Sequence, residues 1–182
     1  MQLWKKALAA VTAGVLCLGS VGISGVQSVL ESVRTVLTAS ADVPGEYDGT
    51  YGDLYYKNDD DLVSIVGCKT TAESVEIPAE IDGKPVTSIE KMAFSGCTSL
   101  TAITIPDSVM SIGDSAFSNC TSLIEITIPD SVTGIEEYAF SGCTSLTAIT
   151  IPDSVTNIGV GVFFDCTSLT EITIPDSVTS IG

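Results

Sequence analysis

Apolar and polar positions in the C-terminal part of the chain follow a pattern that returns every 23 residues. The period is carried by three columns of identical residues: Pro106, Pro129, Pro152 and Pro175; Cys97, Cys120, Cys143 and Cys166; Phe94, Phe117, Phe140 and Phe163. A fixed period of this length is typical of a repeat solenoid, in which each unit packs on its neighbours. The pattern therefore predicts a repeated surface rather than a single active site.

Each unit contains one short predicted strand. The L-x-x-I-x-I spacing of Leu100, Ile103 and Ile105 places these three side chains on the inward side, and Ala102 and Thr104 between them are expected to face outward. The proline that follows ends the strand because it has no N–H to donate. The Asp-Ser pair after it is expected to shape a turn by bonding nearby backbone. The valine, isoleucine and Ala-Phe pair later in the unit return to the interior.

The segment before the regular units predicts a β-hairpin. Residues 54–56 and 62–66 form two apolar runs, and Asn58-Asp59-Asp60-Asp61 between them is a turn cluster. We expect residues 42–73 to provide a flexible lead-in and this hairpin, which covers the N-terminal end of the solenoid, and residues 74–182 to form the solenoid. The aspartates could bind calcium, but they lack the spaced ligands and closing glutamate of an EF-hand, so a solvated turn is favoured.

Residues 1–41 are predicted to be a secretory signal peptide. Two lysines lie near the start, residues 7–26 carry no charge, and Ala39-Ser40-Ala41 is an A-x-A cleavage site. The alternative is an uncleaved membrane anchor, because 20 uncharged residues are enough to span a bilayer. Cleavage is favoured, since glycine and serine dilute the stretch. The sequence thus predicts a secreted or cell-surface protein without membrane insertion after cleavage.

The charge balance excludes some partners. Removal of residues 1–41 takes away three of the seven basic residues and one of the 23 acidic ones, which leaves a net charge of −18, and no lysine or arginine follows Lys91. Such a surface repels phosphate backbones, so nucleic acid and anionic membranes are poor partners. Solubility outside the cell is the favoured explanation; attraction to a basic partner or to divalent cations is the alternative.

The repeated cysteines are predicted to be buried thiols. Disulfides are the first expectation in a secreted protein, but each cysteine occupies the same place in the frame Cys-Thr-Ser-Leu. Copies stacked about 4.7–4.9 Å apart with parallel side chains fit the disulfide dihedral poorly. The chain has no histidine and no C-x-x-C pair, which argues against a zinc site, and no cofactor is expected.

The motif C-T-S-L-x-x-I-T-I-P-D-S-V-x-x-I, followed by A-F in most copies, resembles the BspA-like leucine-rich repeats of bacterial secreted and surface proteins. The similarity extends from about Leu54 to Gly182. It implies a right-handed leucine-rich repeat coil, with a parallel sheet of short strands on one face and irregular or short helical turns on the other. It also implies a role in adhesion or protein binding, and the family offers no shared catalytic residues.

The last unit stops four residues short of a full repeat. Val178 and Ile181 are therefore expected at an open edge, because solenoid ends normally need a polar cap. A fragment of a longer product is the favoured explanation; a partner that covers the end is the alternative.

Outward-facing columns are the candidate binding surface. One column is Thr104, Thr127, Thr150 and Thr173, and its neighbour is Ala102, Glu125, Ala148 and Glu171. The predicted protein-binding face is Thr104, Glu125, Thr127, Thr150, Glu171 and Thr173. Threonine also suits strands for purely structural reasons. A further column, Asp107, Asp130, Asp153 and Asp176, fits turn capping better than calcium bridging.

Catalysis has little support in the sequence. There is no histidine, no G-x-S-x-G and no phosphate-binding glycine loop. The leading hypothesis is an exported, non-enzymatic module that binds a host or neighbouring-cell surface protein. The alternatives are a spacer or accessory repeat of a larger secreted enzyme and, less favoured, binding of ice or crystal surfaces through the threonine column.

Overall fold

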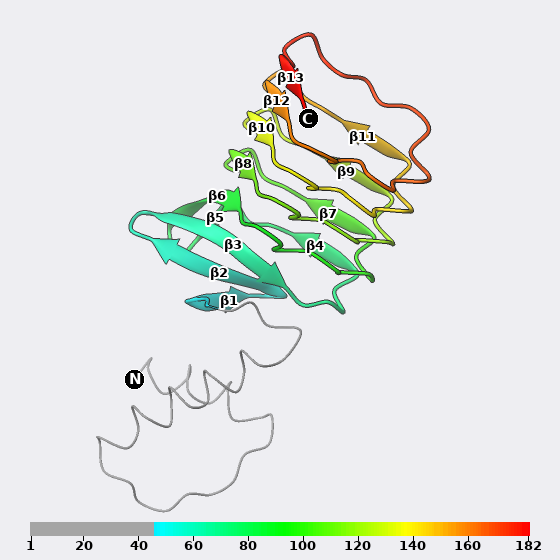
Figure 1. Cartoon of the computed structure of the whole chain (residues 1–182). Coiled ribbons are helices and arrows are strands. Elements are labelled where there is room, and N and C mark those ends of the chain that lie inside the picture. The colour runs from blue at the N-terminus through cyan, green and yellow to red at the C-terminus, as the bar shows by residue number, and fades with distance from the viewer. Residues whose placement is uncertain (1–45) are drawn as a thin grey trace, which may run out of the picture. The chain divides into compact units, whose positions relative to one another are not determined.

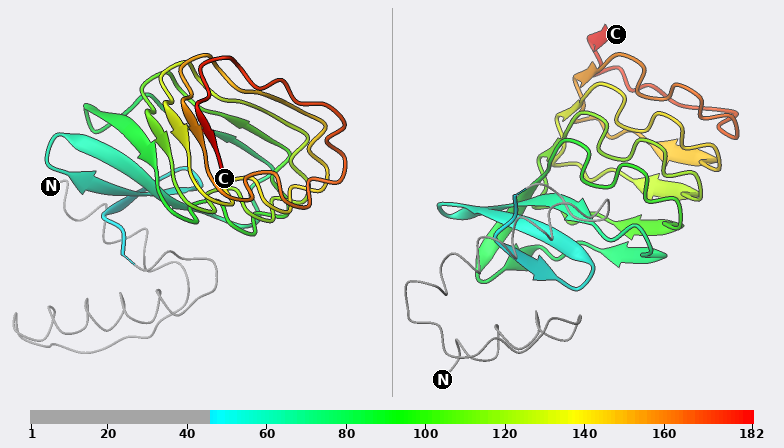
Figure 2. Two further views of the ribbon diagram at one scale, coloured as in Figure 1. Left: turned by 45° about the horizontal axis from the view of Figure 1, so that its top comes forward. Right: turned by 60° about the horizontal axis from the view of Figure 1, so that its bottom comes forward.

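The computed structural model describes residues 46–182 as a stack of similar turns that follows a hairpin (Figures 1 and 2). The predicted signal peptide and the start of the lead-in lie outside the described residues. The elements are β1 Gly49–Tyr51, β2 Leu54–Asp59, β3 Leu62–Cys68, β4 Ser74–Glu76, β5 Glu80–Ile81, β6 Lys84–Ile89, β7 Ala102–Thr104, β8 Ser111–Ile112, β9 Glu125–Thr127, β10 Gly134–Ile135, β11 Ala148–Thr150, β12 Asn157–Ile158 and β13 Ser180–Ile181. The predicted repeat solenoid is thereby confirmed.

The predicted hairpin is present and longer than expected. Strands β2 and β3 pair antiparallel from Leu54↔Cys68 to Asp59↔Leu62, and the turn between them has Asp60 at a φ of 46°. Strand β1, in the predicted lead-in, adds to the free edge of β2. On its other side β3 pairs parallel with β6, so the hairpin continues a sheet of the solenoid. Its function as a protective cap stays a prediction.

The predicted strand forms in every unit but the last, as β4, β7, β9 and β11, and these strands make the first face of the coil. Strand β4 pairs parallel with β7, and β9 pairs parallel with β11 in a one-turn register, as in Ile126↔Ile149. Ile103, Ile126 and Ile149 are buried while their strand neighbours are exposed. The inward and outward positions predicted from the L-x-x-I-x-I spacing are therefore confirmed.

A second sheet, antiparallel in the hairpin and parallel from β3 through β6 to β13, forms another face (Figure 1), and the sequence analysis did not predict its parallel part. Its order is β1-β2-β3-β6-β8-β10-β12-β13, and with β5 it has nine strands. Strands β8, β10, β12 and β13 have only two residues each. Two residues are too few for an alternating pattern to appear in the sequence. These strands exist because equivalent backbone segments are stacked in register.

The segments between β8 and β9, and their equivalents, are turns. The sequence predicted irregular or short helical turns for these segments. No helix occurs among residues 46–182, so the segments are irregular turns. Their N–H groups donate to the next turn along the stack: Phe94 N to Ala116 O (2.8 Å), Phe117 N to Ala139 O (2.8 Å) and Phe140 N to Val162 O (3.0 Å).

Two residues with left-handed backbone conformation in each unit shape these turn segments. The first column is Met92, Ser115, Tyr138 and Gly161, with φ between 54° and 61°, and the second is Gly96, Asn119, Gly142 and Asp165, with φ between 57° and 74°. A left-handed residue costs about 1–2 kcal/mol when it is not glycine. Because the second column holds only glycine, asparagine or aspartate, it avoids most of this cost.

The core is a set of aligned columns. Phe94, Phe117 and Phe140 are fully buried, and their rings stack nearly parallel, with centroids 5.0 and 5.3 Å apart. Phe163 continues the stack at 6.0 Å. Each ring thus lies on its equivalent in the next turn.

Serine and cysteine side chains also bond along the stack. The serine of the Asp-Ser pair was expected to shape its own turn, but it bonds the preceding one instead: Ser154 Oγ donates to Val132 O at 2.6 Å and Ser177 Oγ to Val155 O at 2.8 Å. The repeated thiols do the same: Cys120 Sγ donates to Phe94 O (3.1 Å), Cys143 Sγ to Phe117 O (3.2 Å) and Cys166 Sγ to Phe140 O (3.1 Å).

The cysteine prediction is confirmed for the described residues. All five cysteines among residues 46–182 are buried and none forms a disulfide. Burial raises the pKa of the Cys143 thiol to about 12 and also raises the pKa of the Cys120 and Cys166 thiols. These thiols are small apolar side chains with one weak donor, as the periodic placement indicated.

The last turn has a more exposed interior than the others. Ile181 is 63 % exposed, whereas Ile158, its equivalent one turn earlier, is 3 % exposed, and Val178 is only partly buried. The open edge expected at these two residues is therefore confirmed.

Gly142→Ala is expected to destabilise the fold by about 1–2 kcal/mol, because alanine disfavours a φ of 74°. An added Cβ would also lie 2.6 Å from Asn119 Oδ1. The measurement is urea unfolding followed by circular dichroism. Gly134→Ala is the matched control, because it lies in open space without a left-handed φ and should be neutral or slightly stabilising. Equal losses in the two variants would contradict the assignment.

The buried thiols should resist alkylation. The thiolate is the reactive form, and a raised pKa means that the folded protein retains the proton when an exposed cysteine, with a pKa of about 8.5, has largely lost it. At pH 9 iodoacetamide should therefore leave Cys120, Cys143 and Cys166 unmodified in the folded protein and modify all three in urea. Peptide mass spectrometry measures this, and rapid labelling of the folded protein would refute the burial.

Candidate binding surface

Exposed side chains on β4, β7, β9 and β11 form two columns, which we call the threonine face. The first column is Glu76, Thr104, Thr127 and Thr150, and the second is Ser74, Ala102, Glu125 and Ala148. Register joins Glu76 to Thr104, Thr127 to Thr150 and Glu125 to Ala148. The two-stranded sheets β4-β7 and β9-β11 therefore hold the side chains of each pair in rows separated by one strand spacing, about 4.7–4.9 Å.

The structure places four of the six predicted binding residues on this face, namely Thr104, Glu125, Thr127 and Thr150. Glu171 and Thr173 are exposed in the last turn, where residues 170–175 form no strand. These two residues therefore follow the columns in sequence without the strand pairing that orders the other four.

Sequence reasoning omitted two groups of residues on this face. Glu76 ends the first column and Ser74 ends the second, and both lie on a first copy of the strand that departs from the repeated motif. A further exposed column lies just before the strands and contains Thr101, Ile124 and Thr147. The hydroxyl groups of Thr101 and Thr147 donate to Glu73 O (2.8 Å) and Ile124 O (3.2 Å), so this column also stitches successive turns together. The 23-residue spacing of this column could have revealed it from the sequence.

The threonine face is acidic. Glu76 and Glu125 are exposed, and no lysine or arginine lies on β4, β7, β9 or β11. Residues 92–182 contain ten acidic residues and no basic one. The face therefore offers hydroxyl groups and carboxylates, which suits a partner with hydrogen-bond donors and positive charge.

The lysines of the described residues are gathered at the hairpin end. Lys57 Nζ lies 3.9 Å from Glu46 Oε2, and Lys69 Nζ lies 2.8 Å from Asp53 Oδ1. Lys91 pairs with Asp114. Lys84, the fourth, donates to a main-chain carbonyl of the hairpin turn. Each of these cations is thus engaged within the protein.

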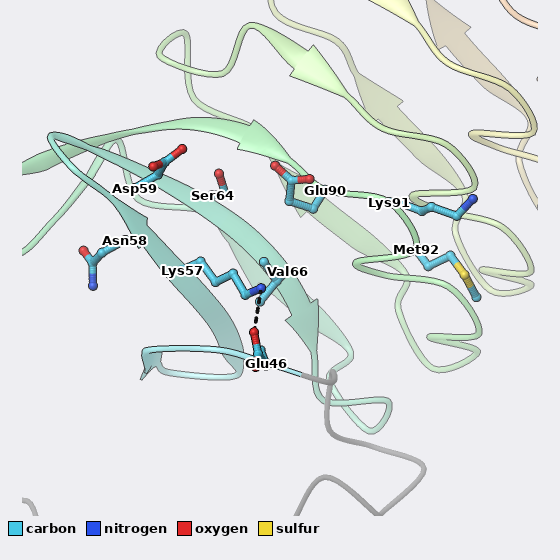
Figure 3. Close-up of a pocket in the computed structure, with 9 residues that line it drawn as sticks. All are labelled: Glu46, Lys57, Asn58, Asp59, Ser64, Val66, Glu90, Lys91 and Met92. Carbon is cyan, nitrogen blue, oxygen red and sulfur yellow. Dashed lines mark ion pairs between the residues drawn. The ribbon is translucent and has the colours of Figure 1, made fainter. Parts of the chain in front are cut away.

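A hollow of about 670 Å³ lies between the hairpin and the first turns, and its lining is Glu46, Lys57, Asn58, Asp59, Ser64, Val66, Glu90, Lys91 and Met92 (Figure 3). The lysines in it pair as described above, and the hydroxyl group of Ser88 donates to Glu90 at 2.9 Å and lies 2.8 Å from Ser64 Oγ. Both lysines of the lining pair with carboxylates, and the chain has no histidine to serve as a base. The hollow therefore resembles a structural junction more than a reaction site.

The aspartates of the turns are exposed at Asp107, Asp130, Asp153 and Asp176. Within residues 46–182 no group of three or more histidine, cysteine, aspartate or glutamate residues is arranged to hold a metal ion. In the same part of the chain no helix has the length and apolar character needed to cross a bilayer.

Comparison with known proteins identifies the repeats. The model of the BspA type leucine rich repeat region matches residues 67–182 in six copies. The chain is similar to the solved leucine-rich repeat protein of T. pallidum, with 37 % identity, a TM-score of 0.69, and coverage of 74 % of this chain and 64 % of that one. No curated protein matches the chain.

Two further solved structures are similar. A leucine-rich repeat protein from Bacteroides ovatus has 38 % identity and a TM-score of 0.68 over 75 % of this chain and 37 % of that one. A leucine rich cell surface protein from Faecalibacterium prausnitzii has 31 % identity and a TM-score of 0.56 over 78 % and 46 %. The chain thus spans less than two-thirds of the length of each of these three relatives.

The matched repeats cover more than half of the chain and coincide with the turns of the solenoid. The resemblance inferred from the repeated motif is therefore confirmed, and the chain belongs to the BspA-type leucine-rich repeat family.

Proposed function

We propose that this chain is an exported, non-catalytic module that binds a protein at the bacterial cell surface, in adhesion or a related interaction. The observation that carries the proposal is the threonine face, an ordered array of hydroxyl groups with two carboxylates and no basic side chain. Similarity to a leucine rich cell surface protein of Faecalibacterium prausnitzii supports the location. A repeated rigid surface is the feature that solenoids use for binding.

The side chains of the threonine face indicate which groups the partner should carry. Glu76 and Glu125 lie in the two different columns, one at each end of the array formed by β4, β7 and β9. Lysine or arginine side chains of the partner would meet them, and amide or hydroxyl groups would meet the threonines between them. Such charge complementarity raises the association rate and fixes the orientation more than it raises affinity.

A spacer or accessory repeat region of a larger secreted enzyme is the alternative function. The chain spans 64 %, 37 % and 46 % of the three solved relatives, so in those proteins such repeats are part of a longer chain. A spacer would bind nothing through the threonine face, so the binding experiment below separates the two functions.

Glu76→Lys with Glu125→Lys is expected to weaken binding by at least about tenfold, equal to 1.4 kcal/mol. Each change places a positive charge against the partner's basic groups. The measurement is surface plasmon resonance of the full chain against a panel of extracellular-matrix proteins, with flow cytometry on intact bacteria as a second readout.

Asp107→Lys with Asp130→Lys is the matched control, since it makes the same charge change in the exposed turns after the strands. It should leave binding within about twofold, equal to roughly 0.4 kcal/mol. Equal loss in both double variants would mean that net charge and not the threonine face determines binding. Absence of saturable binding to every target would favour the spacer function.

A further inference from the structure

The turn after β12 departs from the repeat in one respect. The position held by Lys91, Asp114 and Glu137 in three successive turns is Val160 in the fourth, and the position held by Ser95, Ser118 and Ser141 is Phe164. Charged or hydroxyl side chains are thus replaced by large apolar ones. The core columns of the same turn keep apolar residues at Val162 and Phe163.

These replacements face solvent. Val160 is 45 % exposed and Phe164 is 68 % exposed, and Tyr138 in the preceding turn is 42 % exposed. We call these three residues the turn patch. Glu137, the equivalent of Val160 one turn earlier, is also exposed, and Ser141, the equivalent of Phe164, is half-buried, so both positions reach the surface where a further turn follows.

The two turns that carry the turn patch are joined to each other. A Cβ added at Gly161 would lie 2.6 Å from Tyr138 Cε1, so the tyrosine ring covers this glycine and reaches the turn that carries Val160. Tyr138 N donates to Val160 O at 2.9 Å, and Gly142 N donates to Phe164 O at 2.8 Å. The three apolar side chains therefore project from two turns that are bonded to each other.

Acidic residues flank the turn patch. Glu136 and Glu137 precede Tyr138, and Asp165 follows Phe164; all three are exposed. No lysine or arginine occurs in this part of the chain, since Lys91 is the last basic residue. An apolar centre with an acidic rim is complementary to an apolar segment with basic neighbours.

We propose that the turn patch is a second docking surface, which binds a protein segment whose aromatic or aliphatic side chains are flanked by lysine or arginine. The apolar side chains of the segment lie on Tyr138, Val160 and Phe164, and its basic groups face Glu136, Glu137 and Asp165. The surface belongs to the turns after β10 and β12, so it is independent of the threonine face on β4, β7, β9 and β11.

The probe is a short fluorescent peptide in which tryptophan and leucine alternate with lysine, titrated into the full chain and followed by fluorescence anisotropy. Val160→Glu with Phe164→Ser restores the residues of the preceding turn, so the variant is expected to fold. It should weaken binding by at least about tenfold. The direction of the change separates apolar from purely electrostatic binding. If only charge mattered, the added glutamate would make the basic peptide bind more tightly.

Met110→Thr with Ile124→Thr is the matched control. It also removes two exposed apolar side chains and replaces them with the residue of the equivalent positions, Thr133 and Thr147. It should leave binding unchanged. A peptide with glutamate in place of lysine should bind at least about tenfold more weakly to the unmodified chain.

Three results would overturn the proposal: no saturable binding of the basic peptide to the unmodified chain, equal or tighter binding to the Val160→Glu, Phe164→Ser variant, and equal loss in the Met110→Thr, Ile124→Thr control. The threonine face is tested with different ligands and different variants. Failure of one surface therefore leaves the result for the other intact.

Discussion

Hydrogen bonds that run from each turn to the next along the stack are the interaction on which the rest of the structure depends. Parallel strand pairs such as β10 with β12, the main-chain bonds of the turns, and the serine and thiol donors all join a residue to its counterpart one turn away, within a few residues of the 23-residue period. They keep the turns in register, and this register aligns the phenylalanine rings in nearly parallel stacks. Side chains at one position of the unit therefore form straight columns inside and outside.

The features that each unit encodes locally could be predicted from the sequence. Leu100, Ile103 and Ile105 are buried where their spacing places them, the repeated thiols are buried without disulfides, and the hairpin forms between its two apolar runs. The second sheet could not be predicted, because strands such as β8 and β10 have two residues and arise from stacking rather than from a local pattern. The left-handed conformation of Met92 and Tyr138 was missed for a similar reason, since neither residue favours it by itself.

The candidate surfaces were also predictable from the sequence only in part. The threonine column was visible as a period, and the strands order four of the six residues predicted for the binding face. Glu76 was omitted because the first copy of the repeat is divergent. The turn patch is also written in the sequence, as a break in the period at Val160 and Phe164. Its meaning depends on burial, because an apolar residue that interrupts a repeat could equally lie in the core. In this solenoid one proposed surface is a column of repeated residues, and the other is a place where repeated residues are replaced.

The central claim is that register between turns, rather than any single turn, determines the fold. The most direct measurement compares two deletions by circular dichroism and thermal unfolding. Deletion of Ser118–Phe140 removes one whole unit and lets the flanking turns stack, so we expect a native-like spectrum and a cooperative transition at a lower temperature. Deletion of Ser118–Ile128 removes about half a unit and places strands against turns, so cooperative unfolding should be lost. Equal cooperativity and equal melting temperatures for the two variants would contradict the account.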